Sequence, residues 1–211
     1  MAEIVMILGE SGSGKSSSLR SFKSGEVCVF NVAGKRLPFQ NDWGRNVIKK
    51  PSYEVIKRGI RSGKFRRYVI DDSQYLLAFD SFARASETGY GKFTDMAVNF
   101  YNLLQACRDA PDDAIVYFLH HSDTDDKGFV RPKTLGKMLD SQLNIAGLFT
   151  IVLIARTDGS EYWFETQSNG MSVAKSPMGL FEDTRIPNDL ALVDSAIRAY
   201  YNMDEEETNH D

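Results

Sequence analysis

The stretch Gly9-Glu10-Ser11-Gly12-Ser13-Gly14-Lys15-Ser16 decides the fold of this chain. It follows an apolar run, Ile4 to Leu8, and precedes a segment, Ser17 to Phe22, that can continue as a helix. Strand, glycine-rich turn and helix in this order match the phosphate-binding pattern G-x-x-x-x-G-K-[ST] in the context that it requires. The sequence therefore predicts a phosphate-binding loop (P-loop) at the carboxyl end of a core strand.

The residue types in this stretch suit a nucleoside triphosphate bound with Mg²⁺. The three glycines let the backbone curl tightly, so that its N–H groups point at the phosphates. Lys15 supplies an ammonium for the terminal phosphates, and Ser16 a hydroxyl for Mg²⁺. A glycine-serine turn that ends in Lys-Ser by chance is the alternative. The predicted nucleotide-binding residues are Gly9, Glu10, Ser11, Gly12, Ser13, Gly14, Lys15, Ser16 and Ser17.

Length and composition predict a single domain. With 211 residues the chain can bury one proper α/β core but not two comfortable ones. We expect one domain over residues 1–203 and an acidic, disordered tail over residues 204–211. No apolar stretch approaches the roughly 18 residues that span a bilayer, and the first residues lack the basic segment of a signal peptide. Cys28 and Cys107 lie in a predicted strand and a predicted helix, so we expect reduced thiols in a cytoplasmic protein without a membrane partner.

Apolar runs alternate with helical patterns along the chain. The further predicted strands are Val27 to Phe30, Tyr68 to Asp71, Ala114 to Leu119, Leu148 to Ala155, Tyr162 to Glu165 and a piece around Val173. The predicted helices are Pro51 to Gly63, a helix from Thr94 or Asp95 to before Pro111, Leu135 to Leu143, and a last helix that starts at Asn188 or Asp189 and carries Leu190, Val193, Ile197 and Tyr200 along one face. This alternation predicts an α/β fold with a doubly wound, mainly parallel sheet. Such sheets bind ligands at the carboxyl ends of their strands.

Two pairs of polar residues lie at the carboxyl ends of predicted strands, where such sheets bind their ligands. Asp71 and Asp72 end one apolar strand, and a carboxylate at this place helps Ser16 to hold Mg²⁺. His120 and His121 follow another strand. Because neighbouring residues on a strand point to opposite faces, we expect one of them to serve the site, and we assign His121 to sensing the terminal phosphate. A structural role for the histidine is the alternative.

With these motifs in place, the chain resembles RecA-type ATPases, and more narrowly the small phage RecA-like proteins of recombination by single-strand annealing. Tyr68 to Leu76, Glu87 to Phe93 and the strand end at His120-His121 carry the narrower resemblance, which covers roughly residues 4 to 185. The resemblance implies a RecA-like core that hydrolyses ATP with Mg²⁺ at a subunit interface. It also implies a head-to-tail homo-oligomer, as a ring or a filament, that binds single-stranded DNA.

The resemblance also assigns roles to particular segments. Asp80 to Lys92 and Asp123 to Lys133 match the two DNA-binding loops, and Lys175 lies where such proteins place a lysine that reaches the γ-phosphate of a neighbour. One departure concerns the attacking water, because Asn31 to Arg36 lacks the glutamate that usually positions it. We therefore expect Asp72 to orient or deprotonate the water. If Asp72 cannot reach it, hydrolysis is slow and ATP acts mainly as an assembly switch.

Basic residues gather between Arg45 and Arg67. Nine lysines and arginines stand there against one acid, Glu54, although the whole chain carries a net charge of −4. Such a patch suits the phosphates of a single strand, and the aromatics and cations around Tyr90 suit base stacking. Pairing with acids elsewhere, and aromatics packed under a loop, are the alternatives. The predicted nucleic-acid residues are Arg58, Arg61, Arg66, Arg67, Arg84, Tyr90, Lys92, Arg131 and Lys133.

Two other function classes remain open from the sequence. A P-loop kinase of a small molecule needs an acceptor pocket, and a nucleotide-regulated assembly protein needs little turnover. Stimulation of ATP hydrolysis by single-stranded DNA would favour the RecA-like ATPase over both of these classes. For the adenine base, Phe39 and Trp43 lie in a plausible region of the chain.

Overall fold

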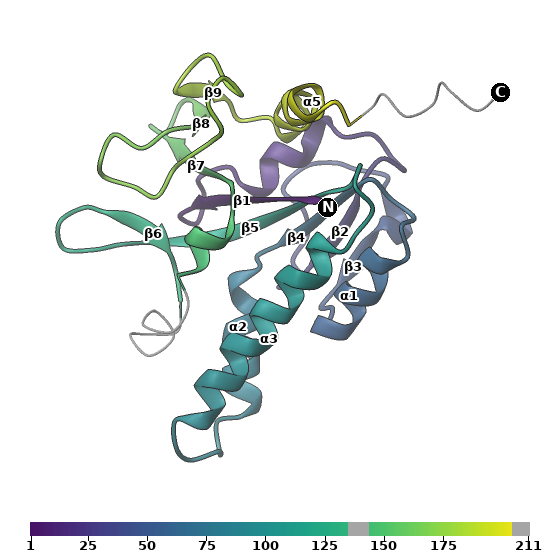
Figure 1. Ribbon diagram of the computed structural model, residues 1–211, viewed down its shortest axis with the longest axis vertical. Helices are drawn as coiled ribbons and strands as arrows, with labels where there is room; N and C mark the ends of the chain where they lie inside the picture. The colour runs from purple at the N-terminus through teal and green to yellow at the C-terminus, as the bar shows by residue number, and fades with distance from the viewer. Residues whose placement is uncertain (135–143, 204–211) are drawn as a thin grey trace.

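A computed structural model describes residues 1–134 and 144–203. The predicted helix Leu135 to Leu143 and the predicted acidic tail lie outside these described residues. Within them, the chain forms a mixed, mainly parallel sheet with the order β3-β2-β4-β5-β1-β7-β8-β9, and β6 pairs with β5 (Figure 1). The strands are β1 (Glu3–Gly9), β2 (Cys28–Asn31), β3 (Val47–Lys49), β4 (Arg67–Asp71), β5 (Ile115–Thr124), β6 (Val130–Pro132), β7 (Ile151–Thr157), β8 (Tyr162–Glu165) and β9 (Arg185–Pro187). The predicted α/β class with a mainly parallel sheet is confirmed.

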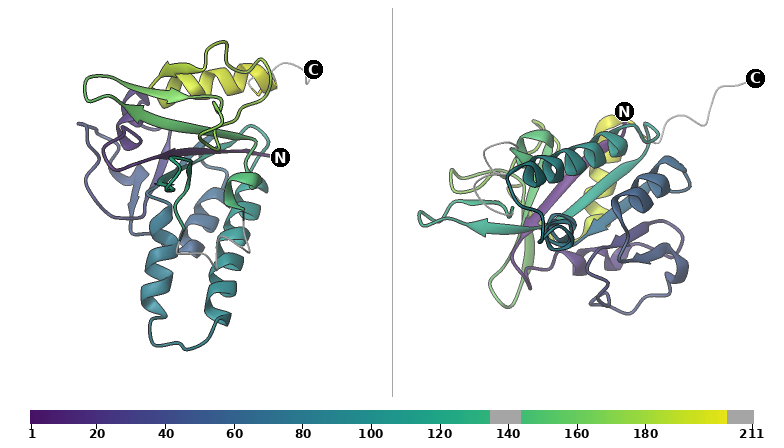
Figure 2. Two further views of the ribbon diagram at one scale, coloured as in Figure 1. Left: turned by 90° about the vertical axis from the view of Figure 1, so that its left-hand side faces the viewer. Right: turned by 90° about the horizontal axis from the view of Figure 1, so that it is seen from below.

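Helices cover both faces of this sheet (Figure 2). Side chains alternate along β1, so Ile4, Met6 and Leu8 join one core cluster with α1 and α3, whereas Val5 and Ile7 join the other with η1 and α5. This alternation follows from the two-residue period of a strand that is buried on both sides. The helices are α1 (Tyr53–Arg61), α2 (Gln74–Ala83), α3 (Gly91–Arg108) and α5 (Leu190–Tyr201), with 3₁₀ helices η1 (Ser16–Ser21), η2 (Gly44–Asn46) and η3 (Ile145–Leu148). Among the described residues, no helix has both the length and the apolar character needed to cross a membrane.

The last helix begins where its cap predicts and differs from the prediction on its buried face. The side chain of Asp189 accepts a hydrogen bond from the N–H of Ala191, which satisfies one of the free donors at the start of α5. Tyr200 was expected on the same face as the buried residues of α5 but is 41% exposed. Asp194 and Arg198 are buried in α5 instead. Arg198 donates to Asp194 and to the carbonyl oxygens of Arg66 and Asp113, which lie just before β4 and β5.

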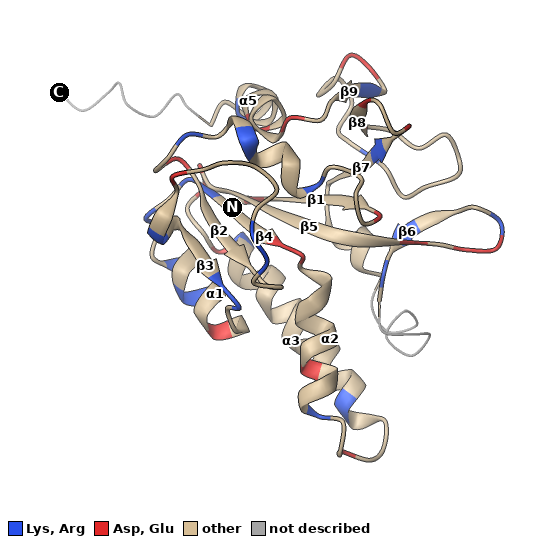
Figure 3. Ribbon diagram, turned by 180° about the vertical axis from the view of Figure 1, so that it is seen from behind, with Lys and Arg blue, Asp and Glu red and all other residues tan. Residues whose placement is uncertain are grey.

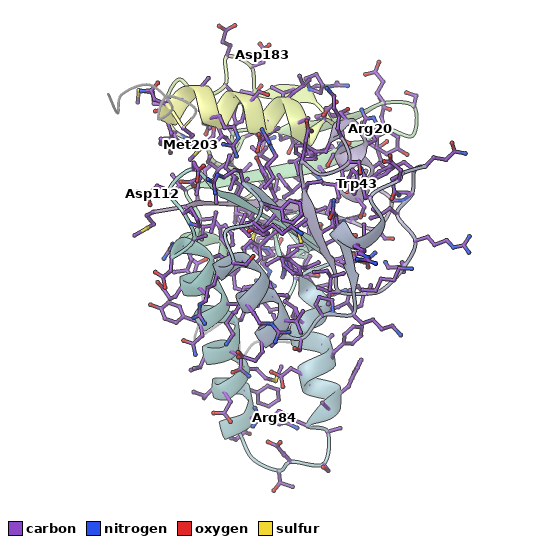
Figure 4. The ribbon with its side chains drawn as sticks, turned by 90° about the vertical axis from the view of Figure 1, so that its right-hand side faces the viewer. Arg20, Trp43, Arg84, Asp112, Asp183 and Met203 are labelled. Carbon is purple, nitrogen blue, oxygen red and sulfur yellow. The ribbon has the colours of Figure 1, made fainter. Side chains whose placement is uncertain are left out.

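The segment Asp80 to Lys92 differs in part from the expected loop, because it holds the end of α2, a connection over residues 84–90 and the first two residues of α3. Helix α2 runs to Ala83 and α3 begins at Gly91, three residues before the predicted start at Thr94. The pair extends away from the sheet (Figure 2), and Figure 4 places Arg84 near its far end. Arg84 donates hydrogen bonds to Glu87 and Asp95. These bonds tie the connection to the first turns of α3, which explains why the helix starts earlier than its apolar pattern suggests.

The segment Asp123 to Lys133 also differs from the expected loop. Strand β5 continues past His121 to Thr124 and pairs antiparallel with β6, with Asp123 opposite Arg131. The turn between them is closed by Asp125, whose side chain accepts hydrogen bonds from the N–H groups of Lys127 and Phe129. Around Val173, where a strand was predicted, the chain forms only isolated bridges. No strand was predicted from the sequence at the position of β9.

A buried ion-pair cluster joins α5 to the middle of the sheet. The carboxylate of Asp194 accepts hydrogen bonds from Arg67 at 2.6 Å, from Arg198 at 2.9 Å and from the Tyr117 hydroxyl at 2.9 Å. Asp194 is 1% exposed and Arg198 is 4% exposed. Buried charges of this kind are tolerated only when every partner stays in place.

We expect Asp194→Ala to lower the free energy of unfolding by about 3 to 5 kcal/mol, because it leaves two arginines without their buried counter-charge. Urea unfolding followed by circular dichroism measures the loss. Asp183→Ala, which removes an exposed carboxylate, is the matched control and should change stability by less than about 0.5 kcal/mol. Equal effects of the two substitutions would contradict the structural role of Asp194.

Candidate nucleotide-binding site

The predicted phosphate loop connects the end of β1 to the start of η1. Gly12 and Gly14 have φ angles of +84° and +90°, a backbone conformation that favours glycine. A Cβ on Gly14 would lie 2.8 Å from Cδ1 of Tyr162, and one on Gly9 would lie 2.9 Å from the carbonyl oxygen of Ala155. The curl of the loop and its close packing therefore account for glycine at all three positions.

The ammonium of Lys15 lies inside the loop. Its Nζ donates hydrogen bonds to the carbonyl oxygens of Gly9 and Glu10, each at 2.7 Å. The residue is only 6% exposed. Burial lowers the pKa of Lys15 to about 8, although the neighbouring carboxylates of Asp72 and Asp71 act in the opposite direction. The side chain is thus held at the centre of the loop, still mainly cationic at neutral pH.

The segment after the loop is a short 3₁₀ helix. Three consecutive serines begin η1, and the hydroxyl of Ser18 donates to the carbonyl of Lys15 at 2.6 Å. Serine side chains compete with helical hydrogen bonds in this way. Because η1 spans only Ser16–Ser21, its dipole contributes little, and an anion in the loop would depend on Lys15 and the loop N–H groups.

Ser16 and Asp71 meet at the carboxyl edge of the sheet. The Ser16 hydroxyl donates to Oδ1 of Asp71 at 2.7 Å. Burial raises the pKa of Asp71 to about 6, and the hydrogen bond from Ser16 partly opposes this rise. Two adjacent oxygen donors fit Mg²⁺, which takes one or two protein oxygens and completes its shell with phosphate and water. Across residues 1–134 and 144–203, no group of three or more histidines, cysteines or acids could hold a metal ion by itself.

Asp72 is held in place by two partners. Its Oδ1 lies 3.2 Å from Nε2 of His121, and its Oδ2 lies 2.8 Å from Nζ of Lys35. Burial by itself would raise the pKa of Asp72, but the hydrogen bonds with His121 and Lys35 outweigh it, so the pKa lies below its ordinary value. The backbone of Asp72 has a φ angle of +60°, an uncommon conformation outside glycine that often marks functional sites.

The two histidines of β5 have different surroundings. His120 is fully buried, with Nδ1 2.9 Å from the hydroxyl of Ser73 and Nε2 2.9 Å from the carbonyl oxygen of Lys133. His121 lies opposite Gly9 in the register with β1 and contacts Asp72. Of the pair, His120 is therefore the structural histidine, and His121 is the one that reaches the candidate site.

Lys35 is the site residue that sequence reasoning missed. Its segment, Asn31 to Arg36, drew attention only for lacking a carboxylate. The order of the strands supplies the missing information, because β2 is parallel to β4 and pairs Asn31 with Asp71. A cation a few residues beyond the end of β2 can therefore reach the same edge of the sheet as Asp72.

Two other predicted site residues lie elsewhere in the fold. Lys175 pairs through its backbone with Val152 of β7, and β7 flanks β1 on the side away from β4 and β5. Trp43 is 4% exposed and packs against Phe39 with ring centroids 5.3 Å apart. Trp43 is thus a core side chain, which corrects the suggestion that it faces an adenine base.

The predicted nucleic-acid residues fall into separate regions. Figure 3 shows Lys and Arg gathered along α1, where Arg58 and Arg61 are exposed. Where α2 connects to α3, Tyr90 is 72% exposed, while Lys92 donates to the carbonyl oxygen of Glu87 at 3.1 Å. Lys133 is exposed after β6. Four of the predicted cations pair with acids of this chain: Arg66 with Asp113, Arg67 with Asp194, Arg84 with Glu87 and Asp95, and Arg131 with Asp123.

We expect His120 to make the fold sensitive to acid. Burial lowers the pKa of His120 from 6.5 to about 4, so the unfolded chain takes up a proton at a higher pH than the folded chain does. Stability should fall as the pH drops from about 6.5 toward 4, by an amount on the order of 3 kcal/mol. Urea unfolding at several pH values measures the free energy of unfolding. This free energy should change less steeply with pH in His120→Gln than in the unchanged protein, and an equal pH dependence would rule this role out.

Comparisons with known proteins assign no family to this chain. No protein-family model matches its sequence, and a search of curated proteins returned no match. The case for a function therefore depends on the motifs and on the geometry described above.

Proposed function

We propose that this protein is a Mg²⁺-dependent ATPase with a P-loop and a RecA-like, doubly wound core. One observation carries the proposal: the carboxyl ends of β1, β5 and β4 lie side by side and bring five polar residues to one edge. These residues are Lys15, Ser16, Asp71, Asp72 and His121. A cation in a glycine loop, an oxygen pair and a carboxylate with a histidine are the parts that ATP hydrolysis requires.

In this proposal the loop binds the phosphates of ATP. Lys15 exchanges its bonds with the carbonyl groups of Gly9 and Glu10 for the more strongly charged phosphate oxygens. Ser16 and Asp71 would hold Mg²⁺, which when bound neutralises negative charge on the phosphates. Gly12 and Gly14 keep the loop in the conformation that exposes its N–H groups to the anion.

The hydrolytic step is assigned to Asp72 with His121. Asp72 orients a water molecule, the oxygen of that water bonds to the terminal phosphorus, and the bond to the leaving ADP breaks as the water's proton passes to the carboxylate. Nε2 of His121 lies 3.2 Å from Oδ1 of Asp72, so His121 would couple the position of Asp72 to the terminal phosphate. The carboxylate takes the place of the glutamate that is missing after β2.

Lys15→Ala tests the binding half of the proposal. The substitution removes the cation at the centre of the loop, so the affinity for Mg-ATP should fall at least about 100-fold, as expected for a charge-assisted contact to phosphate. Equilibrium dialysis with labelled ATP measures this fall. Lys23→Ala, which removes an exposed lysine just after η1, is the control and should bind normally. Unchanged affinity in Lys15→Ala would exclude this loop as the ATP site.

Asp72→Asn tests the hydrolytic half. Asparagine keeps the size of the side chain but cannot take a proton, so kcat should fall by roughly 10²- to 10⁴-fold while ATP still binds. Steady-state phosphate release and equilibrium dialysis give the two numbers. Asp42→Asn changes an exposed acid and should leave kcat unchanged. Normal turnover in Asp72→Asn would assign the water to another residue.

For the substrate of the whole protein, we propose single-stranded DNA. The exposed cations on α1, including Arg58 and Arg61, offer a surface that neutralises phosphates without regard to sequence. As in the RecA-like proteins that the chain resembles, Lys175 would act on the site of a neighbouring copy in a cytoplasmic homo-oligomer. DNA stimulation of ATP hydrolysis that weakens steeply with salt would support this assignment.

A kinase remains the second candidate because of one pocket. It has a volume of about 390 Å³, lies between β3 and the segment that follows β2, and includes the Lys35 that contacts Asp72. Its lining residues are Lys35, Arg36, Leu37, Phe39, Gln40, Asn41, Gly44, Val47 and Lys49. Phosphate found on an added nucleoside would favour the kinase, and free phosphate would favour the ATPase. ATP binding with almost no turnover would favour the nucleotide-regulated assembly protein.

A further inference from the structure

Lys35 is presented to the site by a turn of fixed shape. Asn31, at the end of β2, is 1% exposed. Its amide nitrogen donates to the carbonyl oxygen of Lys35 at 2.6 Å, and its amide oxygen accepts from the N–H of Gly34 at 2.7 Å. Gly34 has a φ angle of +70°, which suits glycine at the bend. One buried side chain therefore closes the turn and directs Lys35 toward β4.

The ammonium of Lys35 lies among the charges of the candidate site. Its Nζ is 2.8 Å from Oδ2 of Asp72 and 5.7 Å from the ring centroid of Tyr75. It is also close enough to Lys15 and Asp71 for its charge to act on both. Two lysines from different loops thus converge on the same pair of carboxylates.

The bond between Lys35 and Asp72 is suited to exchange. The Lys35 side chain is 63% exposed, whereas that of Asp72 is only 9% exposed. The solvated ammonium can therefore move without first being exposed to water, and Asp72 keeps its contact with His121 when the lysine moves. A terminal phosphate carries more negative charge than a carboxylate and competes well for an ammonium.

We propose that Lys35 contacts the terminal phosphate of bound ATP, as a catalytic cation supplied by the same chain that holds the nucleotide. This inference rests on the proposed ATPase function and deepens it. In this structure Lys35 pairs with Asp72. When ATP binds, Lys35 turns to the phosphate, and Oδ2 of Asp72 becomes available to the attacking water. Lys35 forms and breaks no covalent bond; it stabilises the charge that develops on the transferred phosphoryl group.

The affinity ratio of ATP to ADP tests this contact. Lys35→Ala should reduce the preference for ATP over ADP by roughly tenfold or more, because only ATP carries the phosphate that Lys35 contacts. It should also reduce kcat by about 100-fold or more, with partial rescue in Lys35→Arg, which keeps the charge. Binding of Mg-ATP and Mg-ADP by isothermal titration calorimetry gives the ratio. Lys23→Ala, which removes an exposed lysine away from the site, is the control and should change neither value.

The ATP to ADP affinity ratio is also measured in the Asp72→Asn variant. This second measurement shows whether Lys35 contacts the phosphate itself or only holds Asp72 in position. If Lys35 only positions Asp72, adding Lys35→Ala to Asp72→Asn leaves the ATP to ADP ratio unchanged, and the proposal is overturned. If Lys35 contacts the phosphate, the ratio falls in both backgrounds. Failure of the unchanged protein to bind either nucleotide would remove the ATPase proposal and this inference together. Normal ATP hydrolysis in Lys35→Ala would remove this inference alone.

Discussion

The parallel register of β5, between β1 on one side and β4 on the other, fixes the relative positions of the glycine loop, His121 and the strand that ends in Asp71. Hydrogen bonds along both edges of β5 place His121 opposite Gly9, at the mouth of the loop, and Ile70 opposite Phe118 in the core. A slip of one residue would turn each side chain to the other face of the sheet. The buried side chains of β5, from Ile115 to His120, make such a slip costly.

Electrostatic balance is the second constraint at this edge of the sheet. Lys15, Asp71 and Asp72 are each less than 10% exposed, and burying a charge without a partner is expensive. The structure meets this cost with main-chain carbonyls for Lys15, a hydroxyl for Asp71, and Lys35 with His121 for Asp72. In the proposed ATP complex, phosphate oxygens would take the place of the carbonyl groups that Lys15 contacts, and His121 would remain the partner of Asp72.

The basic residues show why composition alone is a weak guide to a binding surface. The segment Arg45 to Arg67 is strongly cationic in sequence, yet it serves two purposes in the fold. Arg67 is a structural residue that pairs with buried Asp194, and Arg66 pairs with Asp113. Arg58 and Arg61 remain on the exposed face of α1. For the proposed contact to DNA, the exposed Arg58 and Arg61 in the middle of this segment are better placed than the paired Arg66 and Arg67 at its end.

Local patterns predicted the elements whose causes are local. The β1 strand and the glycine loop, the strand that ends in Asp71, the amphipathic α1 and the cap at Asp189 all follow from periodicity, glycine positions and capping residues close in sequence. The early start of α3 was missed because Arg84 ties the preceding connection to Asp95 of α3. The extension of β5 was missed because its partner β6 supplies the hydrogen bonds. Neither the ion pair nor the pairing of the two strands produces a periodic pattern of apolar residues in the sequence.

By itself, the sequence determined an α/β chain with a glycine loop, a neighbouring pair of acids and two candidate histidines, because these depend on residue type and spacing. Only the tertiary structure showed that His121 contacts Asp72, which arginines pair with acids of the same chain, and that Lys35 lies at the candidate site. These outcomes depend on the lateral order of the strands, with β2 beside β4 and β5 between β4 and β1. Strand order arises from long-range packing, and contacts between residues far apart in the chain leave no local pattern.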